Sequence, residues 1–346
     1  MRIFNITLAG ISTWKRVNAQ LNVYLFFCVC SLFSACSKSK KSDSNQEQLA
    51  EIGHYLFFDT KLSYNNTKSC ASCHKPEFAF TDGYRTSIGC EGKQVLRNSP
   101  SLINIAFLAH YTLADSSLKN PFQQHINPLY SKSPIELGLH KDSAKIFNEL
   151  SKRSPYADLL VEADIKRFND FWLRKCLAAY IQTLQSRQSR FDRYKKGDDK
   201  ALTPSQIKGL NLFNSEKLKC KYCHSQPDFT INNKSNKHRS VYIYRKINLN
   251  DSGLYLKTNN LNDAFHFRVP GLRNIALTAP YFHDGSLGDL KSVLNYYQTN
   301  DYLNTGMPVK PNFNDTEKQL LLEFLYSLTD SSIFANRNFQ NPFNEP

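Results

Sequence analysis

The chain of 346 residues carries a formal net charge of +14, and 41% of its residues are hydrophobic. This apolar content is typical of a globular protein and excludes an intrinsically disordered one, and the length suffices for two domains with separate cores. The basic charge favours an acidic redox partner or an anionic lipid surface. It does not indicate nucleic-acid binding, because no nucleic-acid motif accompanies it.

Residues 1–35 have the features of a signal peptide of the lipoprotein type. Positive charges precede an apolar run over 21–33, which is too short to span a bilayer comfortably. The run ends at Phe33-Ser34-Ala35-Cys36, which resembles the lipobox of bacterial lipoproteins, where the cysteine becomes the lipidated first residue. A plain cleaved signal is the alternative. In both cases we expect an exported, periplasmic protein, and in the first case a membrane anchor at Cys36.

The leader is followed by a polar segment and then by a helical pattern. Residues 36–47 are rich in Ser, Lys, Asn and Gln and lack an apolar period, which is typical of a flexible tether. Leu49, Ile52, Leu56 and Phe57 recur at helical spacing and predict a helix over 46–57. This helix leads into the first cysteine motif of the chain.

The pattern Cys-x-x-Cys-His occurs twice. The first copy consists of Cys70, Cys73 and His74, and the second consists of Cys220, Cys223 and His224. In a c-type haem site the two thiols bond the vinyl groups and the histidine takes one axial face of the iron. Chance would give about 0.006 such motifs in a chain of this composition. The sequence therefore predicts two covalently bound haems c; a zinc or redox Cys-x-x-Cys pair is the less favoured alternative.

The first motif begins a domain that we place at 48–197. The segment 74–136 is rich in Gly, Pro, Asn and Ser and predicts long ordered loops that wrap the haem. Helices are expected at about 143–151, 155–163 and 168–188. A charged, Gly-containing break at 195–200 predicts the boundary with a second domain, 198–346.

The second domain repeats the order of helix and cysteine motif. Thr203 and Pro204 predict the start of a helix before Cys220. A short strand is possible at 241–244, and two helices are expected near the end, one from about 286 and one over 315–329. The predicted fold is therefore mainly α, with two cytochrome c-like haem domains and long ordered loops. The helix followed by Cys-x-x-Cys-His is the only repeat that we identify.

Further sequence blocks surround both motifs in a fixed order. They are Leu56–Asp59, Ser69–His74, Phe80–Gly83, Arg97–Asn104, Pro134–Gly138, Leu212-Phe213 before the second motif, and Val269–Asn274 running into Thr278–Ser286. With these blocks the chain from about Gly53 to Asp330 resembles the bacterial di-haem cytochrome c peroxidase and MauG family. The runs from Tyr111 to Gly138 and at Gly253–Tyr255 are most similar to the MauG-related MbnH branch.

The resemblance implies roles for both haems. The haem on His74 would be the peroxide site, and the haem on His224 would transfer electrons. Glu136 falls on the family's distal glutamate, and such a base can move a proton from the inner to the outer oxygen of peroxide. Gln124 falls on the family's distal glutamine and would orient peroxide. For Glu136, a solvated loop carboxylate is the alternative.

The resemblance also implies further metal ligands. Tyr297 occupies the position of the sixth ligand of the second haem, which is methionine in the peroxidases and tyrosine in MauG-like members. A core tyrosine is one alternative to this role, and Met307 as the ligand is another. Asn98, with Thr278 and Pro280, matches the residues that bind calcium between the domains in the family, and oxygen ligands suit this ion.

The chain departs from the family pattern at two positions. Leu113 stands where most members have a tryptophan between the haems, so the expected hopping station is missing; Tyr111 or Tyr130 could replace it. Cys90 lies in the loop where some peroxidases carry a histidine ligand. It is a haem ligand, a disulfide partner of Cys176 or a free thiol. We favour an open distal face that needs no reductive gating.

Three functions remain to be compared. The first is a peroxidase that reduces hydrogen peroxide to water with electrons from a small redox protein, a cytochrome c or a cupredoxin. The second is a MauG-like enzyme that uses peroxide to oxidise an aromatic residue of a partner protein. The third is a non-enzymatic di-haem electron carrier, which the predicted role of Glu136 and the resemblance disfavour. The peroxidase is our preferred prediction.

Overall fold

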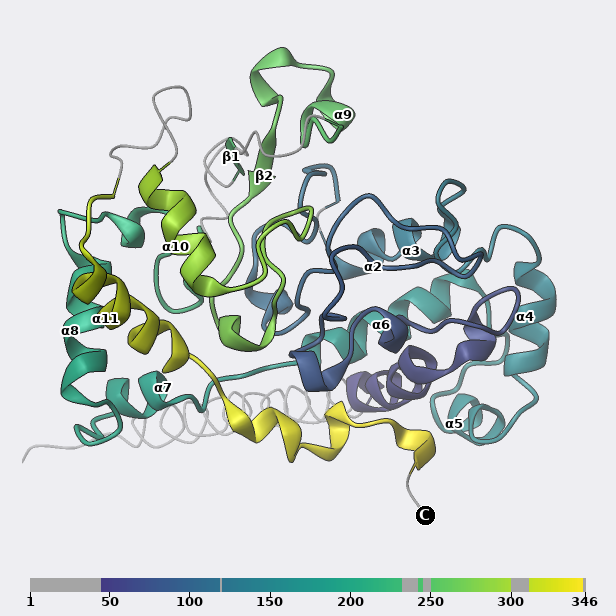
Figure 1. The fold of residues 1–346 in the computed structure, drawn as a ribbon. Helices are drawn as coiled ribbons and strands as arrows, with labels where there is room; N and C mark the ends of the chain where they lie inside the picture. The colour runs from purple at the N-terminus through teal and green to yellow at the C-terminus, as the bar shows by residue number, and fades with distance from the viewer. Residues whose placement is uncertain (1–44, 119, 232–241, 245–249, 300–310, 345–346) are drawn as a thin grey trace, which may run out of the picture. The chain divides into compact units, whose positions relative to one another are not determined.

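Helices and loops make up nearly all of the described chain, as the sequence predicts (Figure 1). The computed structural model describes residues 45–118, 120–231, 242–244, 250–299 and 311–344. Leu49–Pro346 form one compact unit. The predicted signal peptide with Cys36, and Met307, lie outside the described residues. In the part of the chain that the structure describes, no helix is long and apolar enough to cross a membrane.

Residues 45–58 are helical, which confirms the helix expected over 46–57. The α-helices that follow are α2 (Pro121–Gln124), α3 (Ile126–Tyr130), α4 (Ser143–Leu150), α5 (Tyr156–Glu162), α6 (Asp170–Thr183), α7 (Arg190–Lys195), α8 (Pro204–Asn214), α9 (Tyr255–Thr258), α10 (Leu290–Thr299) and α11 (Asp315–Tyr326). Single 3-10 turns occur at Thr60–Leu62, Cys70–Ser72, Pro76–Phe78, Ile105–Phe107, Cys220–Tyr222, Leu261–Asp263, Ile275–Leu277, Ser331–Phe334, Arg337–Phe339 and Pro342–Asn344. The loops expected over 74–136 are therefore confirmed, interrupted only by short turns of helix.

The described residues contain one small sheet. β1 (Tyr242–Tyr244) and β2 (His266–Arg268) pair antiparallel, with Ile243 opposite Phe267. The predicted strand at 241–244 is confirmed over 242–244. A sheet of two short strands cannot bury a core of its own, so the helices supply the cores.

The first core forms where the helix at 49–58 packs on α6. The predicted stripe of Leu49, Ile52, Leu56 and Phe57 is fully buried in it. Gly53 lies at the contact: a Cβ there would stand 2.0 Å from the carbonyl oxygen of Cys176. Only glycine lets the two backbones approach so closely.

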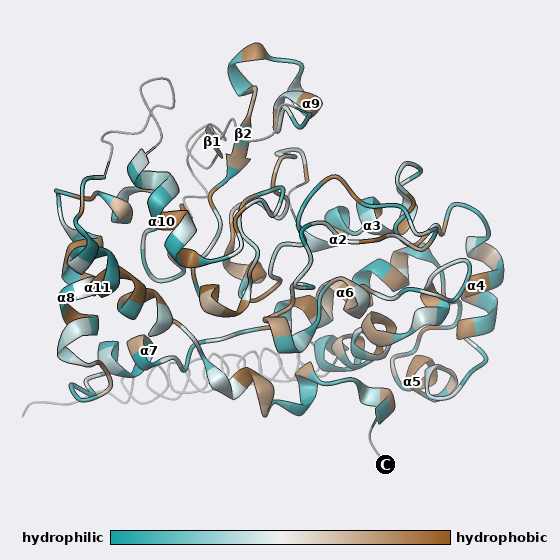
Figure 2. Ribbon diagram, in the orientation of Figure 1, coloured by the Kyte–Doolittle hydropathy of each residue, from teal (hydrophilic) through white to brown (hydrophobic). Residues whose placement is uncertain are grey.

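The second core repeats this arrangement with α8 and α11, which lie side by side (Figure 1). A Cβ at Gly209 would stand 2.0 Å from the carbonyl oxygen of Leu320. Thr203 caps α8 as predicted, and its capping box with Gln206 fixes the start of the helix. Figure 2 shows hydrophobic residues along both helices, and Phe213 and Phe324 are among those buried between them.

The two cores do not follow the predicted boundary strictly. The first core contains residues up to Leu184 and also Ile333 and Phe339 from the end of the chain. The second runs from Phe191 to Leu328. The division at 197/198 stays a prediction.

Helix ends differ from the predicted ones. The helix expected over 168–188 ends at Thr183. The last helix ends at Tyr326 rather than 329, and α10 begins at Leu290 rather than near 286. The early end of α6 has a physical reason, because the backbone beyond it pairs with a buried asparagine instead. Asn104 donates its N–H to the Leu184 carbonyl at 2.8 Å.

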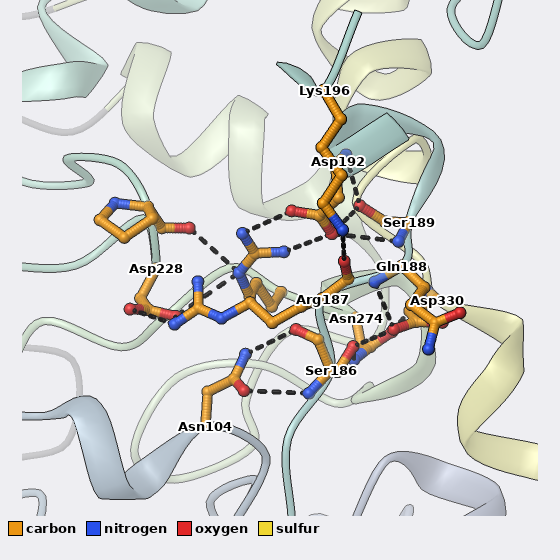
Figure 3. A network of polar contacts seen from close by, with 12 residues as sticks. Asn104, Ser186, Arg187, Gln188, Ser189, Asp192, Lys196, Asp228, Asn274 and Asp330 are labelled. Carbon is orange, nitrogen blue, oxygen red and sulfur yellow. Dashed lines mark hydrogen bonds and ion pairs between the residues drawn. The ribbon is translucent and has the colours of Figure 1, made fainter. Parts of the chain in front are cut away.

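The chain contains a longer repeat than the one identified from the sequence, centred on Asn104 and Asn274 (Figure 3). Both are buried, have φ near +58°, at 59° and 57°, and precede a 3-10 turn of sequence Ile-Ala. The Asn104 side chain pairs with the backbone of Ser186, and the Asn274 side chain accepts from the N–H of Asp330 at 2.8 Å. A 2.8 Å bond from Ser186 to Asp330 joins the two halves of this repeat.

Candidate haem sites

The first Cys-x-x-Cys-His motif forms a single 3-10 turn. Ser69 caps Cys70–Ser72, and the backbone N–H of His74 returns to the Cys70 carbonyl at 3.0 Å. This turn brings both thiols and the imidazole together within the five residues Cys70–His74. Nδ1 of His74 lies 2.9 Å from the carbonyl oxygen of Phe80.

The second motif has the same local structure. Cys220–Tyr222 is a 3-10 turn, and the N–H of His224 donates to the Cys220 carbonyl at 2.9 Å. Nδ1 of His224 lies 2.9 Å from the carbonyl oxygen of Phe229. Phe229 has φ of 54°, as Phe80 has φ of 62°, and both are fully buried. A left-handed backbone is costly for such bulky residues, and here it aims each carbonyl at its histidine.

These contacts orient both imidazoles so that Nε2 can bind the haem iron. When Nδ1 donates to a carbonyl, the imidazole lone pair is on Nε2, the nitrogen that binds a metal. Burial raises the pKa of Cys70 to about 12 and that of Cys220 to about 12. No group of three or more His, Cys, Asp or Glu that could hold a metal ion occurs among the described residues.

A cavity of about 270 Å³ surrounds the second motif, so the cysteines and the histidine that would hold a haem face an open space. Its walls include Cys220, Cys223 and His224. The face of α10 predicted from the sequence lines it too, and Tyr297 is part of that face; the other members are Leu290, Val293 and Leu294. The structure therefore brings His224 and Tyr297 to one cavity.

The same cavity extends to the residues predicted to bind calcium. Asn98, Thr278 and Pro280 all line it. The Asn98 side chain donates to the carbonyl oxygen of Tyr84 at 2.9 Å, and the Asn98 backbone N–H donates to the carbonyl oxygen of His283 at 2.7 Å. The three predicted ligands thus line one cavity, and the chain segments that carry them are hydrogen-bonded to each other.

Ser99 connects this cavity with the first haem site, and Leu113 is a further residue of the cavity lining. Ser99 lines the cavity, and its hydroxyl oxygen lies 3.2 Å from Nδ1 of His74 and 2.6 Å from the Cys73 carbonyl. Leu113 also lines the cavity, at the position where the family has tryptophan. Sequence reasoning missed Ser99, although its place directly after Arg97-Asn98 in a matching block was a signal.

Glu136 lies at the first haem site. The charge of its carboxylate is among the influences that raise the pKa of Cys70 and of Cys73, the latter to about 11 with burial as the main cause. Burial raises the pKa of Glu136 itself. Its backbone N–H donates to Ser131 at 3.2 Å, and its carbonyl accepts from Cys90 at 3.0 Å. Glu136 is therefore a half-buried carboxylate held beside the haem-attachment thiols.

Gln124 ends α2, and the residue after it was missed by sequence reasoning. His125 is 3% exposed, and its pKa is lowered first by burial. The only sequence signal for it is its place beside Gln124. Backbone bonds connect the following helix α3 with the segment of Glu136, because Leu137 donates to the Pro128 carbonyl at 3.1 Å.

The structure excludes one alternative for Cys90 and locates Tyr111 and Tyr130, the two tyrosines that could replace the missing tryptophan. Cys90 and Cys176 form no disulfide, so this one of the three alternatives for Cys90 is excluded. Cys176 is packed in the first core opposite Gly53, whereas the Cys90 thiol lies 3.8 Å from the Ile135 carbonyl. The hydroxyl of Tyr130 donates to Asp170 at 2.6 Å, and Tyr111 packs against the first core.

Two half-buried Cys-x-x-Cys-His turns, each with a histidine whose Nδ1 faces a backbone carbonyl, define a c-type di-haem protein. A family profile described as di-haem cytochrome c peroxidase matches residues 47–200. The cytochrome c551 peroxidase of Pseudomonas aeruginosa is 33% identical over 260 residues, which cover 72% of this chain and 71% of that protein. The methylamine utilization protein MauG of Methylophilus methylotrophus is 27% identical over 82% of this chain and 83% of that protein.

The fold comparison agrees with these relatives. A crystal structure of a MauG-like protein associated with microbial copper homeostasis matches with a TM-score of 0.78 and 31% identity, over 86% of this chain and 94% of that chain. The chain belongs to the di-haem cytochrome c peroxidase family. It is an oxidoreductase of the peroxidase type with two haems c, which confirms the predicted class of enzyme.

Proposed function

We propose that this chain reduces hydrogen peroxide to water at the haem on His74, with electrons that enter through the haem on His224. The observation that carries this assignment is the position of Glu136 beside Cys70 and Cys73. The predicted ligand Tyr297 shares the other cavity with His224. These positions support a half-buried base at the first site and Tyr297 as the second axial ligand at the other.

The reaction needs two electrons and two protons to convert one peroxide into two water molecules. The haems, when bound, supply the redox chemistry of this step. Glu136 takes a proton from one peroxide oxygen and returns it to the other. Burial raises the pKa of Glu136, so its carboxylate is a stronger base than an exposed glutamate and releases the proton less readily. The Gln124 amide orients peroxide by hydrogen bonding.

The test is steady-state peroxide turnover with a reduced cytochrome c or cupredoxin. We expect the native protein to turn over and Glu136→Ala to lose the activity. Glu77→Ala is the matched control, because Glu77 is an exposed glutamate in the loop after the first motif. A long-lived oxidised spectrum after peroxide, with negligible oxidation of the reductant, would refute a peroxidase.

A long-lived oxidised spectrum without oxidation of the reductant would favour a MauG-like enzyme, which uses peroxide to oxidise an aromatic residue of a partner protein. Tyr297 in the lining of the His224 cavity favours this candidate, because a phenolate ligand stabilises the more oxidised states of iron. The likeness to the MauG-like structure points the same way. The partner would then be a protein substrate rather than a small electron donor.

Calcium binding by Asn98, Thr278 and Pro280 is part of the proposal. It is supported by their place in the lining of one cavity and by the oxygen atoms that they offer. Removal of calcium with a chelator should lower the thermal stability, and added calcium should restore it. Asn98→Ala should abolish this response.

Export and lipid attachment at Cys36 complete the proposal. They are supported by the apolar run over 21–33 and by the lipobox-like end of that run. Labelling of cells with a fatty-acid analogue tests the anchor: native protein should be labelled and Cys36→Ser should not. Labelling of Cys36→Ser at the native level would exclude attachment at this residue.

A further inference from the structure

His125 occupies a fixed place between the two predicted distal residues. It joins α2 to α3, directly after Gln124. Its N–H donates to the Pro121 carbonyl at 3.1 Å, and its carbonyl accepts from Leu129 at 3.2 Å. Leu139, three residues after Glu136, donates to the Leu129 carbonyl at 2.8 Å. One hydrogen-bonded framework therefore carries Gln124, His125 and Glu136.

The imidazole of His125 is buried without a hydrogen bond. The residue is 3% exposed, and neither Nδ1 nor Nε2 has a hydrogen-bond partner among the described residues. An unpaired buried polar group costs about 1–3 kcal/mol, which an apolar side chain of similar size would avoid. A histidine kept in such a place indicates a partner outside the polypeptide.

The surroundings of His125 keep its ring neutral. Burial is the main cause that lowers its pKa to about 3, and the charges of Arg174 and His74 act in the same direction. The backbone of Arg174 opposes this shift, but it does not meet the geometry of a hydrogen bond to either ring nitrogen. A neutral imidazole has one donor and one acceptor nitrogen.

The position of Arg174 is itself well defined. Its guanidinium pairs with Asp170, and it lies 4.2 Å from the centroid of the Phe122 ring. Arg174 thus holds α6 against α2 on one side of His125. The charge of His74 is among the influences that lower the pKa of His125, so the two imidazoles are near enough for their charges to interact. His125 therefore has Arg174 of α6 as a neighbour and belongs to the backbone framework that carries Gln124 and Glu136.

We propose that His125 is a third polar residue of the peroxide site, whose neutral imidazole hydrogen-bonds the peroxide that Gln124 and Glu136 also contact. The proposal rests on the function proposed above and adds a residue to it. His125 would donate one hydrogen bond and accept another without taking up the proton. Glu136 remains the group that moves the proton. The two residues then have separate tasks, binding and proton transfer.

Substitution of His125 in the protein with both haems tests this role. His125→Phe removes both nitrogens, whereas His125→Gln keeps a donor and an acceptor. The readouts are the dissociation constant of cyanide at the first haem, from absorbance titration, and the rate constant for reaction with peroxide. We expect His125→Phe to weaken cyanide binding and slow the peroxide reaction by about tenfold or more, and His125→Gln to restore most of both.

The matched control is His140→Phe. His140 is an exposed histidine a few residues after Glu136, and it should tolerate the change in both readouts. The melting temperature of His125→Phe should equal or exceed that of the native protein, because an unpaired buried imidazole is removed. His125→Leu repeats the test with a smaller apolar side chain.

Three results would overturn the proposal. Native cyanide affinity and peroxide reactivity in His125→Phe would make His125 a core residue. A marked loss of melting temperature in both apolar variants would mean that the imidazole is paired within the protein. A low-spin first haem in the native protein that becomes high-spin in His125→Phe would make His125 an iron ligand instead.

The proposal and the proposed function can fail separately. Cyanide titration requires no turnover, so it tests His125 even if the native protein does not reduce peroxide. Native turnover in Glu136→Ala together with weakened cyanide binding in His125→Phe would refute the role of Glu136 and leave that of His125 intact. The reverse pair of results would refute His125 alone.

Discussion

Ser99 touches both haem sites: its hydroxyl oxygen lies 3.2 Å from Nδ1 of His74, and the residue lines the cavity that contains His224. Because the Ser99 hydroxyl donates to the Cys73 carbonyl, its oxygen can share the Nδ1 proton of His74 with the Phe80 carbonyl. Leu113 cannot act as a hopping station in this cavity. Ser99 therefore provides a hydrogen-bonded connection from His74 to the cavity of the second motif.

Ser99→Ala should raise the reduction potential of the first haem and slow electron exchange between the haems. Loss of a hydrogen bond at Nδ1 makes the imidazole a poorer electron donor to the iron. A contribution of about 1 kcal/mol corresponds to about 40 mV for a one-electron couple. Spectroelectrochemical titration gives the potential, and flash photolysis gives the exchange rate.

Ser101→Ala is the control for Ser99→Ala. Ser101 lines the same cavity, but its hydroxyl donates to the Ala79 carbonyl at 2.6 Å and not toward His74. The first-haem potential of this variant should stay at the native value. Equal shifts in the two variants would mean that Ser99 acts only through cavity packing.

Glu136→Gln should lower the rate constant for peroxide reduction by about 10²–10⁴-fold, because an amide cannot take up the peroxide proton. Burial raises the pKa of Glu136 above its usual 4.5. The base is lost as the pH falls through this raised pKa, so the acidic limb of kcat/KM should lie above pH 4.5. The measurement is kcat/KM over a pH series for native protein and variant.

Stability gives an independent check on the same carboxyl group. The pKa of Glu136 is higher in the folded protein than in the unfolded chain, so the folded protein holds this proton more tightly. As the pH rises from the usual pKa to the raised one, the free energy of unfolding therefore falls. Glu136→Gln has no ionisable group at this position and avoids the fall in the free energy of unfolding, so it should be more stable than native protein at pH 7. Glu77→Gln, which changes an exposed glutamate, should leave the stability within about 0.5 kcal/mol.

The sequence was sufficient wherever a local pattern determines the structure. The two cysteine motifs, the buried stripe from Leu49 to Phe57 and the cap at Thr203 were all predicted and confirmed. The face of α10 with Tyr297 was predicted to meet the second haem, and it lines the His224 cavity. Each of these features depends on residues within a few turns of chain.

Features that depend on distant partners could not be predicted. Asn104 and Asn274 are unremarkable polar residues in the sequence, yet each organises a 3-10 turn through partners more than fifty residues away. The sequence left three alternatives open for Cys90 for the same reason, since spacing does not show which thiols meet, and the structure excludes the disulfide with Cys176. His125 is another case, because its burial depends on α6.

Gly53→Ala and Gly209→Ala should each destabilise the protein. The added methyl would stand 2.0 Å from a backbone carbonyl, of Cys176 or of Leu320, so a helix pair must move apart. Overpacking of this kind typically costs about 1–3 kcal/mol. Thermal unfolding followed by circular dichroism measures the loss for the protein with both haems.

Gly288→Ala is the control for the glycine variants. A Cβ at Gly288 meets no heavy atom within 4 Å, so the melting temperature should stay near the native value. A comparable loss in all three variants would point to a general effect of alanine at these glycines. The close contacts at Gly53 and Gly209 would then not limit the helix packing.

Tyr297→Met should raise the reduction potential of the second haem, because a thioether ligand favours ferrous iron and a phenolate favours ferric iron. The exchange keeps a ligand on the α10 face that lines the His224 cavity. Spectroelectrochemistry measures the potential, and the ferric absorption spectrum should change from a tyrosinate type to a methionine type. If native protein is a MauG-like enzyme, the variant should gain turnover with a small reductant.

Tyr296→Met is the matched control for Tyr297→Met. Tyr296 is adjacent on α10, and its ring packs on Phe282 at a centroid distance of 4.8 Å. Since it does not line the cavity around His224, its replacement should leave the ferric spectrum and the potential of the second haem unchanged. An unchanged spectrum in Tyr297→Met would contradict ligation by Tyr297, and Met307 would then be the residue to substitute.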